Sequence, residues 1–365
     1  MKSTIPHFSS MRAESGRAGA MSVPRTPEQA NRLKWTKGRR GHYEVYYLTF
    51  NHLKSRSGFW IRYTMTAPVQ GGPEPWAQIW FSYFNYPEPE KNFGLTAKYP
   101  ISALHAEHSD FQLLIGHNGL SDGRAAGRIQ GLGRTVEWDF RFIPSETVHL
   151  HLPRMLYRVH LADTLALCPH LDVYLNGRVT IDGQTFELKN DPGNQTHLWG
   201  EKHAERWAWV HCNAFAEDRT ATLEGLSVQI KRLGVPLPPF NFLFLRYRGK
   251  DYRFTELHHL ACTGGKFEPG LWQLRAQAGN TLFKGEISAR FQDMVCAEYA
   301  DPDGDPAWCH NTEVGHSAIR VYRRPHPLAS WRHEDTLTSL ATTHVEFAGR
   351  KRDPRVTRSI EVIPS

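Results

Sequence analysis

Stretches in which hydrophobic and polar side chains alternate occur along most of the chain. The clearest is 136–142, where one valine and three aromatic residues alternate with two acids and an arginine. A period of two residues is typical of a β-strand with one buried and one exposed face. Comparable stretches predict strands at 43–50, 59–66, 76–84, 207–213, 222–230, 240–247, 252–256, 271–277, 284–293, 316–322 and 343–347.

Turn signals separate these strands, and helical patterns are scarce. Asp182-Gly183 lies between 178–181 and 184–188 and predicts a tight hairpin, because both residue types tolerate a positive φ. The best helix candidate is 27–33, with a weaker one at 161–167. Many short strands with turns between them indicate an all-β protein built from sandwiches or barrels, and 365 residues suffice for two such units.

A cluster of turn-favouring residues at Asn190–Asn194 predicts the boundary between these units. We therefore expect an N-terminal unit over 35–192 and a C-terminal unit over 193–365. We also expect the last residues, 351–365, to cross back to the first unit. Residues 1–34 have little periodic hydrophobic pattern and are predicted to form a disordered tail.

Positive charge is concentrated in this tail. The net charge is +7, and residues 1–41 hold nine basic and two acidic side chains, so the rest of the chain is neutral. This excludes a basic nucleic-acid-binding body, although the tail could contact a membrane surface. No hydrophobic run reaches the roughly 18–20 residues of a membrane helix, no secretory signal is visible, and the five cysteines are widely spaced. We expect free thiols and a cytoplasmic protein, possible membrane contact being limited to the tail.

Aromatic and histidine residues are densest just after the predicted boundary. On the strand at 207–213, Trp207, Trp209, His211 and Asn213 share one face. One interpretation makes this face the wall of a hydrophobic cavity with a polar end. The other makes the tryptophans core residues and the polar pair part of a buried hydrogen-bond network.

The same region carries a resemblance to a known family. Trp199-Gly200 is followed by Trp-Ala-Trp-Val-His-Cys-Asn-Ala-Phe at 207–215, and the stretches 58–64, 77–81 and 179–188 fit the same pattern. Together they resemble the tocopherol cyclase, carotenoid 1,2-hydratase and AttH-like group over about residues 42–350. The resemblance implies two tandem lipocalin-like antiparallel β-barrel domains with a cavity for isoprenoid or lipid-like molecules.

Together, the resemblance and the interpretation of the tryptophan face as a cavity wall predict a cofactor-independent cyclase, hydratase or isomerase that uses acid catalysis in an aromatic-lined cavity. Burial raises the pKa of a carboxyl group, and tryptophan faces stabilise a carbocation. The candidate catalytic residues are His197, Glu201, His211 and Glu224. The candidate substrate contacts are Arg62, Trp80, Trp199, Trp207, Trp209 and Asn213. The expected partner is a hydrophobic small molecule, with no cofactor or metal. The alternative is a non-catalytic lipid or isoprenoid carrier.

Three other motifs point to different chemistry. His197, His203 and His211 with Glu201 suggest zinc, but their spacing matches no common zinc site. Gly119–Gly123 matches the Gly-x-Ser-x-Gly pattern of serine hydrolases, but the glycines that follow disfavour the required helix. Asp301–Asp305 resembles the start of a calcium loop without its final acid. We expect turns at both of the last two motifs.

Overall fold

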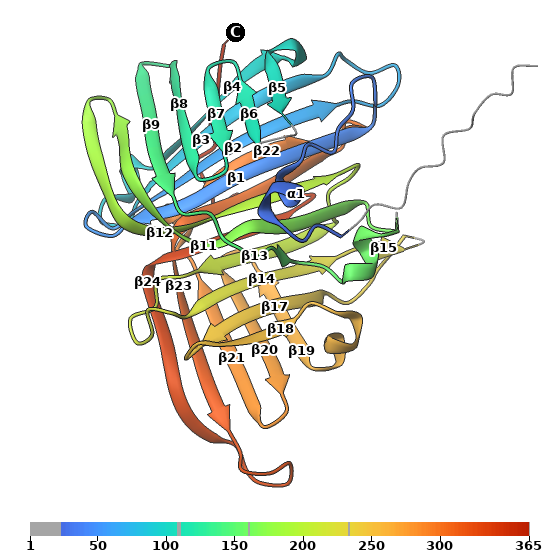
Figure 1. Cartoon of the computed structure of the whole chain (residues 1–365), viewed down its shortest axis with the longest axis vertical. Helices are drawn as coiled ribbons and strands as arrows, with labels where there is room; N and C mark the ends of the chain where they lie inside the picture. Colours follow the sequence, from blue (N-terminus) through green and yellow to red (C-terminus); the bar gives the residue numbers. More distant parts are fainter. Residues whose placement is uncertain (1–22, 108–110, 160, 233, 365) are drawn as a thin grey trace, which may run out of the picture.

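Strands form nearly all of the regular structure. The computed structural model describes residues 23–107, 111–159, 161–232 and 234–364. Two curled sheets lie one above the other along the long axis of the molecule (Figure 1). The helical elements are short: α1 (Pro27–Asn31), η1 (Pro89–Lys91), η2 (Ile101–Ala103), η3 (Arg154–Tyr157), η4 (Leu257–Ala261) and η5 (Phe291–Asp293).

The N-terminal sheet follows the order β25-β4-β3-β2-β1-β12-β11-β9-β8-β7-β6-β5, with β10 beside β11. Strand β3 contacts β6 and β4 contacts β8, so the sheet folds back on itself and encloses a core. Its strands are β1 (His42–His52), β2 (Ser57–Ala67), β3 (Trp76–Asn85), β4 (Phe93–Pro100), β5 (Leu104–Glu107), β6 (Gln112–Ile115), β7 (Asn118–Ser121), β8 (Arg124–Gly131), β9 (Arg134–Phe142), β10 (His149–Leu150), β11 (Thr164–Ile181), β12 (Gln184–Gly200) and β25 (Ile360–Ile363).

The C-terminal sheet follows the order β18-β17-β14-β13-β24-β23-β21-β20-β19, with β22 beside β23. Strand β17 also contacts β19, where Thr263 Oγ1 donates a hydrogen bond of 2.9 Å to the carbonyl of Asn241. Its strands are β13 (Arg206–Cys212), β14 (Thr222–Gln229), β17 (Phe240–Tyr247), β18 (Lys250–Phe254), β19 (Thr263–Glu268), β20 (Leu271–Ala278), β21 (Thr281–Ser288), β22 (Val295–Ala300), β23 (Pro306–Arg323) and β24 (Arg332–Gly349). A separate pair consists of β15 (Lys231–Arg232) and β16 (Val235–Pro236).

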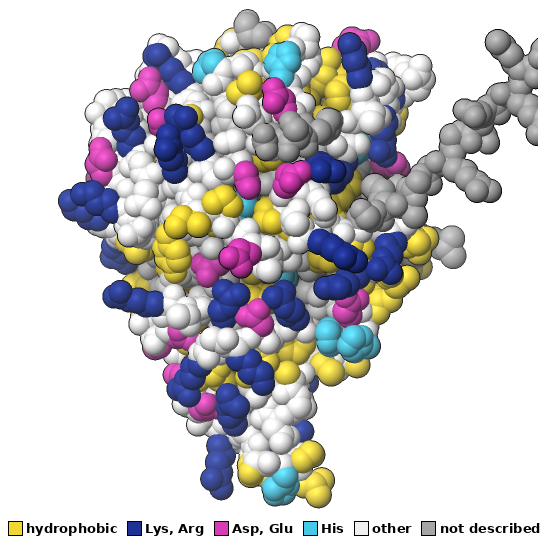
Figure 2. Space-filling view, in the orientation of Figure 1, with side chains coloured by type: hydrophobic (Ala, Val, Ile, Leu, Met, Phe, Trp, Pro, Cys, Tyr) yellow, Lys and Arg dark blue, Asp and Glu magenta, His cyan; other side chains and the backbone are white. Residues whose placement is uncertain are grey.

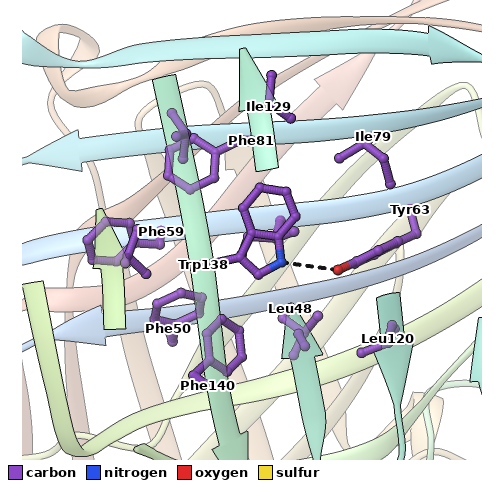
Figure 3. Close-up of a cluster of buried hydrophobic side chains, with 14 of the residues drawn as sticks. Leu48, Phe50, Phe59, Tyr63, Ile79, Phe81, Leu120, Ile129, Trp138 and Phe140 are labelled. Carbon is purple, nitrogen blue, oxygen red and sulfur yellow. Dashed lines mark hydrogen bonds between the residues drawn. The ribbon is translucent and has the colours of Figure 1, made fainter. Parts of the chain in front are cut away.

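Each curled sheet surrounds its own hydrophobic core, which confirms the predicted all-β, lipocalin-like class. In the N-terminal core, the alternation predicted at 136–142 is present in β9, where the apolar side chains are buried and the charged ones exposed. Trp138 lies at the centre of this core, and its Nε1 donates to the Tyr63 hydroxyl at 3.2 Å (Figure 3).

The two units pack together through their outer surfaces. Every residue of β1 and β2 is buried, because one face of each strand points into the N-terminal core and the other meets the C-terminal sheet. Tyr47 of β1 meets Trp209 of β13 edge to face, with ring centroids 5.5 Å apart. This second contact explains why aromatic residues occupy both faces of the sequence 43–50.

Two predictions about domain organisation need correction. Strand β12 runs through the predicted boundary at 192/193, and its residues 193–200 pair with β1 in the N-terminal sheet. The chain passes to the other sheet between Gly200 and Arg206. Of the predicted disordered tail, residues 1–22 lie outside the described residues, whereas α1 is folded and its Ala30 and Asn31 are buried.

Other local predictions can be checked directly. The predicted helix near residue 27 is present as α1, but the one at 161–167 is wrong, because β11 begins at Thr164. The hairpin turn at Asp182-Gly183 has φ values of 49° and 84°, as predicted. The crossing of the C-terminal residues is confirmed, because β25 pairs with β4 in parallel.

On the face seen in Figure 2, basic and acidic side chains are interspersed. This agrees with the neutral charge balance of residues 42–365. None of the helices in the described ranges is long and apolar enough to cross a membrane.

A buried carboxyl group lies in the contact between the units. Both carboxyl oxygens of Glu313 are buried and have no hydrogen-bond partner among the described residues. A side chain at Gly58 of β2 would collide with Glu313, and Asn51 Nδ2 donates to the Glu313 carbonyl at 2.7 Å. Burial, with a smaller contribution from Glu346, raises the pKa of Glu313 well above its usual value. His344 Nδ1 lies 3.7 Å away, but burial lowers the pKa of His344 and keeps it neutral.

The substitution Glu313→Gln should therefore stabilise the protein at high pH. The folded state holds a proton on Glu313 that the unfolded chain releases above pH 4.5, so stability is lost as the pH rises. Glutamine mimics the protonated acid. We expect the melting temperature to rise by roughly 1–2 °C at pH 8, the effect of about 1 kcal/mol on a chain of 365 residues, and to change little at pH 4. The exposed Glu187→Gln is the control. A lower melting temperature of Glu313→Gln than of the wild type at pH 8 would contradict the raised pKa of Glu313.

Candidate functional site

A cavity of about 310 Å³ lies between the two units. It is at the small end of the range for ligand pockets, which is about 300–1,000 Å³. Aromatic and aliphatic side chains make up most of its wall. The strand residues that line it are Tyr43, Tyr47, Trp60, Arg62, Thr164, Ala166, Thr196, Leu198, Trp207, Trp209, Leu226, Val228, Phe240, Phe242, Tyr299 and Glu346.

Strand β13 places two tryptophans on this wall. Trp207 and Trp209 point away from the C-terminal core and toward the cavity, whereas Ala208, Val210 and Cys212 point into that core. The cavity therefore lies outside both curled sheets, where their outer faces do not meet. Both interpretations of the tryptophan face hold in part, because the two indoles line the cavity and also belong to the hydrophobic contact between the units.

Among the described residues, two carboxylic acids line the cavity, Asp163 and Glu346 of β24. Glu346 pairs in register with Trp209, and Trp207 Nε1 donates to its Oε2 at 3.5 Å. Burial raises the pKa of Glu346, while the charge of Arg62 and the Trp207 hydrogen bond lower it; the net pKa lies above the usual value. Glu346 is thus a carboxyl group that retains its proton at higher pH than an ordinary glutamate.

Glu346 was not among the residues predicted from the sequence. The stretch 343–347 was predicted as a strand, and in it His344 and Glu346 alternate with Val345 and Phe347. An acid on the polar face of a short strand usually faces solvent. Here the N-terminal unit covers that face, so the acid is buried.

Seen from the cavity, Glu224 of β14 lies directly behind Trp209. Its pKa is shifted in the opposite direction from that of Glu346. Glu224 Oε1 accepts hydrogen bonds from Trp209 Nε1 at 2.5 Å and from His151 Nε2 at 2.7 Å. Its Oε2 lies 2.8 Å from His211 Nδ1. Burial alone would raise the pKa of Glu224, but the hydrogen bonds from His151 and His211 outweigh it and lower the pKa to about 2. Glu224 is therefore ionised, and His151 extends from this cluster to the cavity wall.

The other predicted catalytic residues lie elsewhere. His211 contacts Glu224 but does not line the cavity. His197 lies on the opposite face of β12 from the cavity-lining Thr196 and Leu198, between the Ala30 carbonyl at 2.6 Å and Glu44 at 2.9 Å. Glu201 is exposed and pairs with Arg39 at 3.3 Å.

The predicted substrate contacts are also divided. Arg62, Trp207 and Trp209 line the cavity, as described above. Trp199 is not among the residues that line the cavity, although it packs in a hydrophobic cluster with the cavity-lining Leu152 and Phe242. Asn213 Nδ2 donates to the Gly193 carbonyl at 3.1 Å. Trp80 lines a neighbouring chamber instead.

The three histidines considered for zinc do not meet. His197, His203 and His211 each contact a different carboxylate: Glu44, Asp301 and Glu224, respectively. A different set, His151, Cys168 and Glu224, has ligand atoms within 4.8 Å of one another. Hydrogen bonds from His151 and Trp209 already occupy the Glu224 oxygen, and burial raises the pKa of the Cys168 thiol. These atoms form a hydrogen-bond network and do not present an open set of metal ligands.

The remaining two motifs form turns. Ser121 ends β7, and the chain turns directly into β8, so no helix follows the Gly119–Gly123 motif as a serine hydrolase would require. In Asp301–Asp305, the carboxylates of Asp303 and Asp305 bind Lys202 at 2.6 and 2.5 Å.

Several known proteins resemble this chain over most of its length. The uncharacterized proteins Rv0493c and MT0513, from two strains of Mycobacterium tuberculosis, are each 26% identical over 301 residues, which cover 81% of this chain and 86% of theirs. A candidate AttH protein from Nitrosomonas europaea has a similar structure, with a TM-score of 0.54, 15% identity, and coverage of 87% of this chain and 95% of that one. Kievitone hydratase from Nectria haematococca has a TM-score of 0.50 and 9% identity, with coverage of 83% and 88%. These two structures share the fold.

The sequence model of the tocopherol cyclase-like family matches residues 159–348, just over half of the chain. The match includes β13, β14 and β24, which carry Trp209, Glu224 and Glu346. It confirms the resemblance found in the motifs of the sequence. This protein therefore belongs to the tocopherol cyclase-like family.

Proposed function

We propose that this protein is a cofactor-independent enzyme in which Glu346 protonates a hydrophobic, unsaturated substrate of the isoprenoid or lipid-like class. The observation that carries the proposal is the pair of buried glutamates around Trp209. Glu346 lines the cavity with a raised pKa, and Glu224, behind the indole, has a lowered one. Two carboxyl groups whose surroundings shift their pKa values in opposite directions are typical of acid–base catalysis.

The proposed reaction begins with transfer of the Glu346 proton to one carbon of a substrate double bond. The carbocation that forms would lie against the electron-rich faces of Trp207, Trp209 and Tyr299, which also line the cavity. Capture by a hydroxyl group of the same molecule gives a ring, and capture by water gives an alcohol. In either case the oxygen releases one proton, which returns to the Glu346 carboxylate.

The comparisons support this class of reaction. Cyclisation started by a proton and hydration of a double bond share their first step. The family is named after a cyclase, and one solved structure with this fold is a hydratase. The substrate and the choice between ring closure and hydration are part of the proposal.

Glu224 has a supporting role in this proposal. It receives the Trp209 N–H and thereby fixes the indole ring on the cavity wall. Its negative charge also contributes to the raised pKa of Glu346. An ionised Glu224 is a poor proton donor, so we assign the acid to Glu346 rather than to Glu224.

The substitution Glu346→Gln should trap unreacted substrate. Wild-type protein and variant are purified without detergent and extracted with organic solvent, and the bound small molecules are identified by mass spectrometry. We expect the variant to carry the precursor of the compound bound to the wild type, either lighter by one water or an isomer with a different retention time. Glutamine keeps the shape of the acid but cannot donate its proton.

Glu313→Gln is the matched control, because Glu313 is also a buried glutamate with a raised pKa but does not line the cavity. It should carry the same compound as the wild type. If the wild type and Glu346→Gln hold the same molecule with the same retention time, the protein is a carrier of the kind considered from the sequence.

Glu224→Gln should act mainly on stability. A folded-state pKa of about 2 against the ordinary 4.5 corresponds to a contribution on the order of 3 kcal/mol at neutral pH, lost as the pH falls from 4.5 toward 2. Urea unfolding should show that loss for the variant at pH 7 and less than half of it at pH 3. Glu201→Gln, at an exposed site, should change stability by less than about 0.5 kcal/mol. Equal losses at both pH values would argue against an ionised Glu224.

A further inference from the structure

Arg62 of β2 is a buried cation with an unused hydrogen-bond donor. Its side chain is only 5% exposed, and Nη1 has no hydrogen-bond partner among the described residues. The guanidinium lies among aromatic rings, 4.0 Å from the ring centre of Tyr299, 5.6 Å from that of Trp60 and 5.7 Å from that of Trp80. A buried charge without a polar partner is costly, so this arrangement points to a missing acceptor.

The acids near Arg62 have other hydrogen-bond partners. Glu346, on the same cavity wall, has a raised pKa because of its burial and accepts from Trp207. Asp301 binds His203 at 2.6 Å and Arg350 at 2.7 Å. Neither of them is bonded to the guanidinium of Arg62.

Arg62 separates two chambers of different character. One is the hydrophobic cavity of about 310 Å³, and the other is a chamber of about 360 Å³. The side chains that line both are Tyr43, Arg62, His203 and Tyr299. The second chamber has polar side chains in its wall, among them Thr64, Gln78 and Thr96. A ligand with a hydrophobic chain and a charged end would thus find a matching surface on each side of Arg62.

We propose that Arg62 binds the carboxylate of a hydrophobic carboxylic acid, whose chain occupies the 310 Å³ cavity. The planar guanidinium presents two parallel N–H groups that match the two oxygens of a carboxylate. This proposal rests on the proposed function in naming the ligand as its substrate, but binding itself does not require proton transfer by Glu346.

Charge balance favours a carboxylate over a phosphate. Arg62 is the buried cation of the site. Lys98, in the second chamber, is exposed and lies over the Trp76 ring, and Lys202, in the first, is bound by Asp303 and Asp305. One buried positive charge balances a carboxylate, whereas a phosphate monoester would leave excess negative charge in a hydrophobic site. A bound carboxylate would also offset the effect of Arg62 on Glu346 and help that acid to keep its proton.

The test compares two isoprenoid probes that differ only at one end, farnesoic acid and farnesol. Their dissociation constants are measured at pH 7.5 by tryptophan fluorescence and by calorimetry. We expect the wild type to bind the acid at least tenfold more tightly than the alcohol. Arg62→Met should weaken binding of the acid at least tenfold and of the alcohol less than twofold. Lys98→Met, the control for a cation of the second chamber, should change both by less than twofold.

Several results would overturn the proposal. These are equal binding of the two probes by the wild type, binding of neither, or an equal effect of Arg62→Met on both. Arg62→Lys covers the case in which the methionine variant does not fold. Lysine keeps the charge but lacks the paired donors. The affinity of Arg62→Lys for farnesoic acid should therefore be lower than that of the wild type but higher than the affinity for farnesol. Full acid affinity in this variant would contradict two-point binding.

The Glu346→Gln variant separates this inference from the proposed function. It should bind farnesoic acid at least as well as the wild type does, because Glu346 is not the carboxylate-binding group. If Glu346→Gln carries the same bound molecule as the wild type but the acid preference depends on Arg62, the protein is a carboxylic-acid carrier. If Glu346→Gln carries a different bound molecule from the wild type but the acid preference does not depend on Arg62, the protein is an enzyme whose substrate lacks the carboxylate.

Discussion

The contact between the outer surfaces of the two curled sheets determines most of what is distinctive in this protein. Because β1 and β2 are buried on both faces, neither side of these strands is available to solvent. Each strand belongs to one core through one face and to the contact between the units through the other. The cavity forms where this contact is incomplete, so strands of both units form much of its wall.

The same contact explains why the pKa values of two glutamates only one tryptophan apart are shifted in opposite directions. Glu224 receives three hydrogen bonds from ring N–H or ring nitrogen partners, and these compensate for its loss of water. The hydrogen bonds of Glu346 to Trp207 and Cys309 only partly offset its burial, which therefore dominates. Local hydrogen bonding, rather than depth of burial, separates the lowered pKa of Glu224 from the raised pKa of Glu346.

Sequence patterns predicted the fold class and most of the strands, but only part of the site. The alternation at 136–142 and the turn at Asp182-Gly183 depend on neighbouring residues, and both appear as predicted. The family resemblance led to the strand with Trp207 and Trp209. It could not separate them from Trp199, which lies on a strand of the other sheet and is not among the residues that line the cavity. Glu346 was missed because its burial depends on strands some 300 residues earlier in the chain, beyond the reach of any local pattern.

The return of the C-terminal residues to β4 has a consequence for biosynthesis. Strand β25 covers one edge of the N-terminal sheet, and it follows its partner β4 only after a long stretch of chain. During translation, β4 therefore remains an open edge while more than 250 further residues are added. Open strand edges can pair with other chains. The nascent chain is consequently exposed to misassembly until β25 has been made, and synthesis of β25, rather than of β12, completes the sheet.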